Sequence, residues 1–212
     1  DGNGTQDVLA TGGASTLEFL SSQGEGVFTP SVILTPAAAI YSLVAADFDG
    51  NGITDAAFVA YPSEPDETTT GIVSVSFGQQ GAIPAQPMAV ATVVGPARLI
   101  AGRFLLQGGA ADLAIQTSDD AAVAFLRGSA TRQFLSTFVF RDSLPPPYAT
   151  FVGVKSLEGI AVGNFAAADA KRAPIAALTT SADGSDHRVD LVTIGAEGAL
   201  EEVTTPSPFD CD

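Results

Sequence analysis

The sequence predicts an all-β fold built from repeated four-stranded units, and three observations favour this fold. Glycine (22 residues) and proline (13 residues) are frequent, as short strands joined by many turns require. The segment "DGNGTQDVLA" at 1–10 is nearly copied as "DGNGITDAAFVA" at 49–60. After each copy, an apolar strand is followed by a strand in which apolar and polar residues alternate.

The repeat has a measurable spacing. Asp1 precedes Asp49 by the same 48 residues that separate Asp7 from Asp55. Two weaker copies follow, in which a phenylalanine marks the matching position. The distance from Phe48 to Phe104 is 56 residues, and from Phe104 to Phe165 it is 61 residues. A period of this size is typical of stacked or radially arranged units.

Each unit is expected to contain four strands. The first strand is nearly all apolar and ends at the phenylalanine, as in "YSLVAADF", "ARLIAGRF" and "GIAVGNF". The second is "DVLA" and its equivalents, the third alternates as in "LEFLSS" and "VSVSFG", and a fourth follows a turn. Continuous apolar character predicts that the first two strands are buried on both faces, whereas alternation predicts a half-exposed third strand nearer the edge.

Four-stranded antiparallel units arranged radially are the plan of a β-propeller. We therefore expect one propeller, or a part of one, over 1–212. Its four blades should span 1–40, which lacks its first strand, and 41–96, 97–157 and 158–212. A closed four-bladed ring would need a donor for the missing strand, because a radial sheet does not leave a strand edge exposed.

The segment "VAADFDGNGITDAAFVA" at 44–60 resembles the FG-GAP/VCBS repeat, the blade type of the integrin α-subunit propeller. The copy at 1–10 matches from the third position of the loop onward, and the later copies keep the apolar frame and the phenylalanine but lack the acidic loop. The resemblance implies a ring of about seven blades. The remaining blades would then come from further segments of the same polypeptide or from a partner.

The loop "DFDGNGITD" at 47–55 has the chemistry of a calcium site. Ca²⁺ takes six to eight oxygen ligands and accepts irregular geometry. Gly50 and Gly52 permit a tight turn, because glycine adopts positive φ. The spacing matches an EF-hand loop, but the flanks are predicted strands and the twelfth position is Phe58 instead of glutamate. The expected ligands are Asp47, Asp49, Asn51 and Asp55 through side chains, and Ile53 through its carbonyl.

The first copy of the loop predicts a second calcium site, with Asp1, Asn3 and Asp7 as side-chain ligands and Thr5 as a carbonyl ligand. A turn without metal is the alternative for both loops, because Asp, Asn and Gly favour turns in any case. The third and fourth loops should bind no calcium, since their ligand positions hold Arg103, Leu105 and Gln107, or Asn164 and Ala166.

Composition narrows the class of partner. The net charge of −15 repels nucleic acid and anionic lipid, and no apolar run reaches the length that crosses a bilayer. A Ser185–His187–Asp190 triad is not expected, because these residues share one hairpin and no oxyanion-hole motif accompanies them. We therefore predict a non-enzymatic module that binds a protein or a glycan, or serves in adhesion or assembly. The non-catalytic propeller of a larger secreted enzyme acting on polysaccharide or phospholipid is the alternative.

The start of the chain and its cysteine bear on location. The sequence opens "DGNGTQD", which indicates that a leader has been removed or that the chain belongs to a longer one. Cys211 is the one cysteine, so it is either a free thiol or half of an intermolecular disulfide. Together with calcium binding, these features predict an extracellular, cell-surface or periplasmic protein.

Overall fold

The structure, a computed structural model, describes most of the first two thirds of the chain and the strands of the last third. The described residues are 4–12, 16–34, 38–80, 86–104, 109–117, 123–140, 154–162, 175–181, 187–194 and 200–204. All regular elements among them are β-strands, which confirms the all-β prediction. Within these ranges no helix has the length and apolar character of a membrane span.

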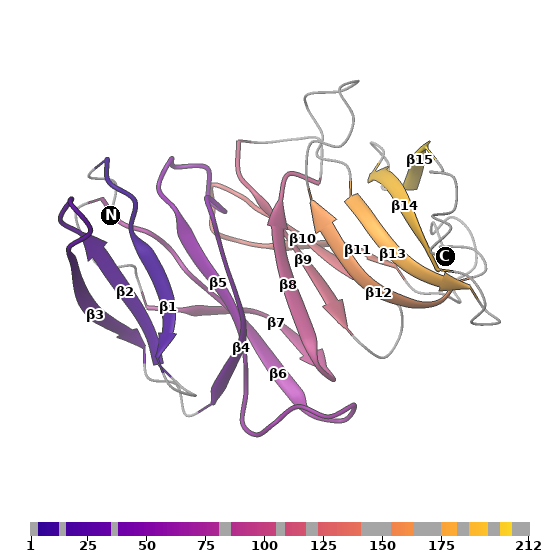
Figure 1. The fold of residues 1–212 in the computed structure, drawn as a ribbon, viewed down its shortest axis with the longest axis horizontal. Helices are drawn as coiled ribbons and strands as arrows, with labels where there is room; N and C mark the ends of the chain where they lie inside the picture. Colours follow the sequence, from indigo (N-terminus) through magenta and orange to yellow (C-terminus); the bar gives the residue numbers. More distant parts are fainter. Residues whose placement is uncertain are drawn as a thin grey trace.

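The described strands form four antiparallel sheets, in each of which consecutive strands pair with one another (Figure 1). The first sheet has three strands and the other three have four, so the prediction of four-stranded antiparallel units is confirmed for the latter. The first sheet contains β1 (Val8–Gly12), β2 (Thr16–Ser22) and β3 (Phe28–Leu34). The second contains β4 (Ala39–Ala46), β5 (Asp55–Tyr61), β6 (Thr70–Ser76) and β7 (Met88–Val94).

The third and fourth sheets follow the same order. The third contains β8 (Ala97–Gly102), β9 (Asp112–Thr117), β10 (Val123–Arg127) and β11 (Leu135–Phe140). The fourth contains β12 (Val154–Val162), β13 (Ile175–Ser181), β14 (His187–Ile194) and β15 (Leu200–Thr204). The repeat predicted a fourth strand in this unit without placing it, because the "LEEVT" of β15 lacks the apolar alternation that marks the other strands.

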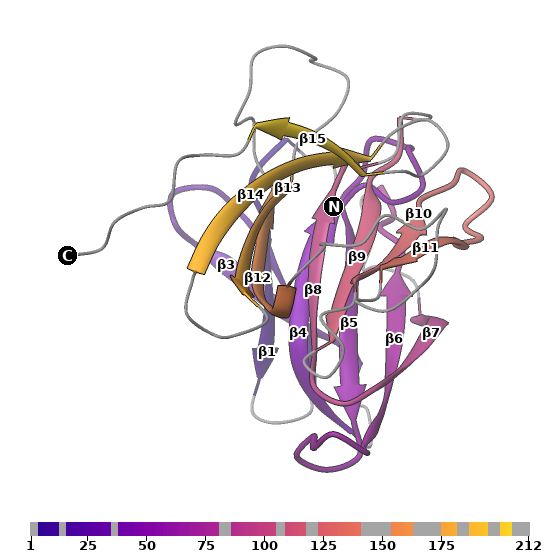
Figure 2. The same ribbon diagram turned by 90° about the vertical axis from the view of Figure 1, so that its right-hand side faces the viewer.

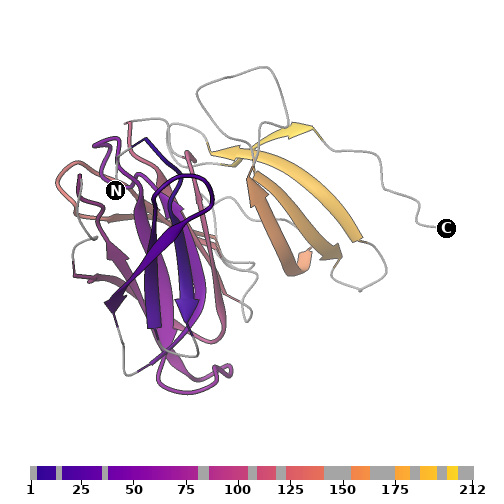
Figure 3. The same cartoon turned by 60° about the vertical axis from the view of Figure 1, so that its left-hand side comes forward.

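The first strands of the sheets lie next to one another. β4 contacts β8, and β8 contacts β12. Figure 2 shows these strands near the middle of the molecule, with β7, β11 and β15 farther out. The sheets follow one another along the molecule in chain order (Figure 1), and Figure 3 shows the fourth sheet, in orange and yellow, to one side of the others. The sheets thus fan out from their first strands, in the order in which propeller blades follow one another.

The two faces of β5 belong to two different hydrophobic cores. Its side chains alternate between the faces, and every one of them is buried. Val59 and Tyr61 belong to the core shared with the third sheet, whereas Phe58 and Ala60 pack with Leu17 of the first sheet. Burial of β5 on both faces confirms the expectation for the second strand of the repeat. The expected alternation of the third strand is also present, since Ile72 of β6 is exposed between two buried neighbours.

β4 differs from its prediction. Its apolar sequence predicted burial on both faces, but most of its side chains are only partly covered, and Tyr41 is 47% exposed. The reason is its place in the fan. β4 lies at the edge of its sheet, where it pairs with β5 on one side only, and its contacts with β1, β2 and β8 of the neighbouring sheets are fewer than those with β5.

Candidate metal centre

The acidic loop, residues 47–55, joins β4 to β5 in the second sheet. Ala46 and Asp55 face each other across the two strands, so the loop closes a tight antiparallel hairpin. Gly50 (φ 74°) and Gly52 (φ 85°) both adopt the left-handed backbone conformation that L-residues avoid. These angles confirm the role predicted for the two glycines, and strands flank the loop instead of the helices of an EF-hand.

Asp47 organises the backbone of the loop. Its Oδ1 accepts hydrogen bonds from the amides of Gly50 (2.7 Å) and Asn51 (3.1 Å), and its Oδ2 accepts one from Gly52 (2.8 Å). An aspartate that accepts amides a few residues ahead stabilises a turn without help from any metal. The geometry of the loop is therefore set partly by its own side chains, which would reduce the cost of forming a metal site.

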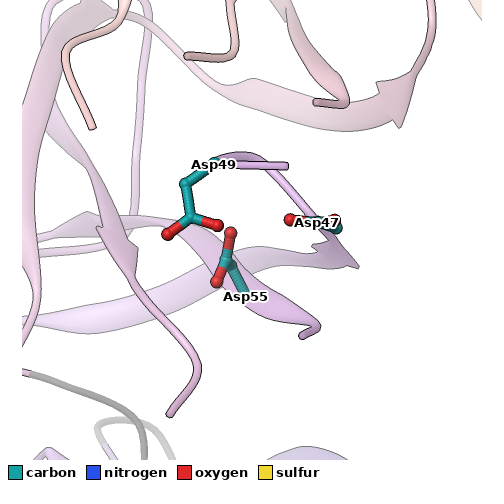
Figure 4. A group of neighbouring side chains, drawn as sticks. All are labelled: Asp47, Asp49 and Asp55. Atoms are coloured by element: carbon teal, nitrogen blue, oxygen red, sulfur yellow. The ribbon is translucent and has the colours of Figure 1, made fainter. Parts of the chain in front are cut away.

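Three carboxylates meet at this corner of the sheet. Asp47, Asp49 and Asp55 each offer one oxygen, and these oxygens all lie within 4.8 Å of one another. Figure 4 shows the carboxylates of Asp49 and Asp55 facing each other, with Asp47 beside them. Asp49 is 4% exposed and Asp55 is fully buried. Like charges this close, with little water between them, repel strongly unless a cation or a proton neutralises them.

Asn51 and Ile53 lie at the outer side of the cluster. The Asn51 Nδ2 donates to Asp49 Oδ2 (3.0 Å), and the Ile53 amide donates to Asn51 Oδ1 (2.6 Å). The structure thus brings Asn51 to the carboxylates through Asp49, and its Oδ1 already accepts one hydrogen bond. The predicted ligand roles of the Asn51 amide oxygen and the Ile53 carbonyl stay predictions.

Asp55 also accepts two backbone hydrogen bonds, a role that the sequence did not predict. Its Oδ2 accepts the Phe48 amide (2.7 Å), and its Oδ1 accepts the Gly78 amide (2.8 Å) at the end of β6. One carboxylate therefore joins the acidic loop, the start of β5 and the end of the third strand. We call this arrangement the aspartate bridge. Burial raises the pKa of Asp55 to about 6; the two amide donors oppose this shift, and the charges of Asp49 and Asp47 add to it.

The aspartate bridge recurs in full in the third sheet and in part in the first. Asp112 Oδ2 accepts the Phe104 amide (3.0 Å), and its Oδ1 accepts the Gly128 amide (3.2 Å). In the first sheet, Asp7 Oδ1 accepts the Ser22 amide (2.9 Å). The third loop keeps this aspartate although its other acidic positions are gone, so hydrogen bonding alone accounts for the residue there. That retention within the chain was the signal that could have revealed the bridge.

The other predicted ligands are only partly described. Asp1 and Asn3 of the first predicted calcium site lie outside the described residues. Thr5 donates its Oγ1 proton to the Ser22 carbonyl (3.2 Å), close to the Asp7 contact. In the third loop, Arg103 donates from Nη2 to the Gly109 carbonyl (3.1 Å). Leu105, Gln107, Asn164 and Ala166 lie outside the described residues, as do Ser185 and Cys211.

A cation from the neighbouring sheet reaches the cluster. Arg132, in the turn between β10 and β11, donates its Nε proton to Asp49 Oδ2 at 3.0 Å. Its guanidinium also lies over the Phe77 ring, 4.8 Å from the ring centre. Sequence reasoning missed this pair, because Arg132 and Asp49 are 83 residues apart and belong to different repeats.

The donor set fits a hard divalent cation. All three side chains of the cluster present carboxylate oxygens, the ligands that Ca²⁺ prefers, and among the described residues no histidine or cysteine joins them. The three carboxylates carry a formal charge of −3, which Arg132 offsets only in part. The remaining negative charge would attract a cation. Asp47, Asp49 and Asp55 are the residues that would hold it.

Part of the chain matches a known family. Residues 1–58 match the FG-GAP-like repeat family. The matched stretch includes the first sheet, β4 and the whole acidic loop. No curated protein matches the chain. The chain therefore contains an FG-GAP-like repeat, which covers residues 1–58.

Proposed function

We propose that this chain forms part of an extracellular β-propeller that calcium stiffens and that presents its loops to a protein or a glycan. It acts in adhesion or in the assembly of a surface structure, and it carries no catalytic centre. The observation that carries the proposal is the cluster of Asp47, Asp49 and Asp55 at a hairpin corner inside an FG-GAP-like repeat.

The role of calcium in this proposal is structural. A bound Ca²⁺ offsets two of the three carboxylate charges and ties the acidic loop to the start of β5, where Asp55 already joins the loop to the residues that follow β6. Because the unfolded chain does not assemble the site, binding adds to folding stability, by about 2.7 kcal/mol at a calcium concentration 100 times the Kd. Extracellular calcium modules work at Kd values of about 10⁻⁴–10⁻³ M, which agrees with an extracellular location.

Ring closure is the second part of the proposal. The first strands of the sheets lie side by side, and the sheets follow one another in chain order. Further blades, from the same polypeptide or a partner, complete the ring. This arrangement is supported by the strand order and the family match, and it protects sheet edges that would otherwise pair with other chains.

A groove near the acidic loop is the surface we propose for partner contact. It has a volume of about 940 Å³ and lies between the first two sheets. Leu9, Phe19 and Leu43 give it apolar walls, and Ile53 and Thr54 of the acidic loop form part of its border. The three carboxylates are not among its lining residues, so the groove and the cation site are adjacent and separate.

Calorimetric titration of the chain with Ca²⁺ tests the metal site directly. We expect one binding event in the wild type at minimum, a higher Tm with calcium than with EDTA, and weaker binding of Mg²⁺, which requires near-ideal octahedral geometry. In Asp49→Ala, calcium should no longer raise the Tm above its value in EDTA. Identical melting curves for the wild type in calcium and in EDTA would contradict the proposal.

A further inference from the structure

The turn between β10 and β11 places an arginine in an unusual backbone conformation. The Arg132 amide donates to the Ser129 carbonyl (2.8 Å), and the Thr131 amide donates to Ser129 Oγ (3.2 Å). Arg132 itself has φ 60°, in the left-handed region, where glycine or asparagine is the usual residue. Favourable contacts of the Arg132 side chain would offset this backbone cost.

Those contacts all lie on the second sheet. The guanidinium pairs with Asp49 and covers the Phe77 ring. Two residues farther along, the Phe134 ring packs against Phe77 (6.5 Å between ring centres) and Phe48 (5.9 Å). The Ser129 amide donates to the Phe48 carbonyl (3.0 Å). The whole turn is therefore docked against the acidic loop and the residues beside it.

We propose that Arg132 is an internal counter-ion of the acidic loop. It neutralises part of the carboxylate charge, so that the loop can form and the third sheet can dock before a metal binds. For the same reason it lowers the affinity of the loop for a divalent cation. The second statement rests on the proposed calcium site, whereas the first does not.

Whether Arg132 raises or lowers the calcium affinity depends on which oxygen of Asp49 each positive group contacts. Asp49 Oδ2 accepts both Arg132 Nε and Asn51 Nδ2, while Oδ1 accepts only the Asn51 amide among the contacts seen. A cation that binds through Oδ1 would leave the arginine in place on Oδ2. The two positive groups then lie on one carboxylate and repel each other in a site where Asp49 is almost fully buried. By reciprocity, bound calcium must weaken the contribution of Arg132 by the same factor.

Three variants separate charge from geometry. Arg132→Gln removes the charge, and Arg132→Lys retains it but loses the Nε donor. Arg98→Gln is the matched control, because Arg98 is an exposed residue of the same sheet at the opposite end of β8 from Gly102. For each protein, the Kd for Ca²⁺ is measured by calorimetry, and the Tm is measured in EDTA and in saturating calcium.

We expect Arg132→Gln to bind Ca²⁺ about five- to tenfold more tightly than the wild type. This is the lower end of the usual range for coupling between two sites, because the Arg132 side chain is 46% exposed and its charge is partly screened by water. The Tm of Arg132→Gln should fall in EDTA and fall less in calcium. Arg132→Lys should keep an affinity close to that of the wild type, and Arg98→Gln should match the wild type in every measurement.

Two results would overturn the inference. The first is unchanged or weaker calcium binding in Arg132→Gln, which would mean that the arginine only positions Asp49. The second is a Tm in EDTA equal to that of Arg98→Gln, which would mean that no counter-ion is needed. A wild type without measurable calcium binding contradicts the proposed metal site instead, because the comparison in EDTA still decides whether Arg132 is the counter-ion.

Discussion

At the scale of single residues, one aspartate at the start of the second strand is used for two purposes. In the second sheet, Asp55 belongs to the carboxylate cluster and also accepts the amides of Phe48 and Gly78. In the third sheet, Asp112 makes the equivalent pair of hydrogen bonds without acidic neighbours in the loop. The structural use therefore does not require the metal, and an aspartate already fixed in this way is a ready ligand.

Replacing the bridge aspartates separates the two uses. Asp112→Asn and Asp55→Asn each turn one accepting oxygen into a donor that faces a backbone amide, and each should lower the free energy of unfolding by about 2 kcal/mol, as for buried hydrogen bonds to a charged group. Urea denaturation in EDTA and in calcium measures this. The loss in Asp112→Asn should be the same in both, whereas the loss in Asp55→Asn should be larger in calcium. If both variants lose the same free energy of unfolding in calcium, Asp55 is not a ligand of the metal.

The pKa of Asp55 predicts a dependence on pH when no metal is bound. Because burial raises this pKa from 3.8 to about 6, the folded state holds its proton more tightly than the unfolded state does. The resulting stabilisation is present in full below pH 3.8 and is lost as the pH rises to about 6. In EDTA, the Tm of the wild type should therefore fall relative to the Tm of Asp55→Asn as the pH rises from 4 to 6. The effect of calcium on the Tm should grow over the same interval, and a flat difference would show that Asp55 is ionised throughout.

At the scale of elements, local patterns predicted most strands. Alternation and continuous apolar runs placed β2, β5 and β9 close to their observed bounds, since those patterns reflect which faces are covered. The fourth strand of the last unit, β15, was expected from the repeat but could not be placed, because "LEEVT" at the outer edge of its sheet has no apolar pattern. The partial exposure of β4 was missed because it depends on how neighbouring sheets are placed, which a repeat pattern does not contain.

The end of the third strand offers a test of close packing. A Cβ on Gly78 would lie 2.3 Å from the Thr54 carbonyl oxygen, a backbone atom that cannot rotate away. Gly78→Ala should therefore lower the free energy of unfolding by about 3 kcal/mol, the upper part of the range for overpacking. Gly109→Ala is the matched control, because a Cβ there meets nothing within 4 Å. Chemical denaturation of both variants checks the difference, and equal stabilities would mean that the strand end is loosely packed.

At the scale of the whole molecule, the acidic loop lies at the contact between two sheets. The Ala111 amide donates to the Asp47 carbonyl (2.7 Å), the Ser129 amide donates to the Phe48 carbonyl (3.0 Å), and Arg132 reaches Asp49. The sequence predicted the three clustered carboxylates because they lie within one nine-residue loop. It could not predict these partners, because each comes from the next repeat and is brought near only by the packing of sheets.

These inter-sheet hydrogen bonds make hydrogen exchange a probe of how far calcium acts. If the ion orders the acidic loop, it also orders the carbonyls that accept the Ala111 and Ser129 amides, and these amides lie next to β9 and β10 of the third sheet. Removing calcium with EDTA should therefore speed exchange at these two amides as well as at Gly50 and Gly52. The Gly95 amide, which donates to the Thr69 carbonyl at the far end of the second sheet, is the internal reference and should not change. Faster exchange confined to 47–55 would mean that the ion stiffens one hairpin only, and that the sheets dock independently of it.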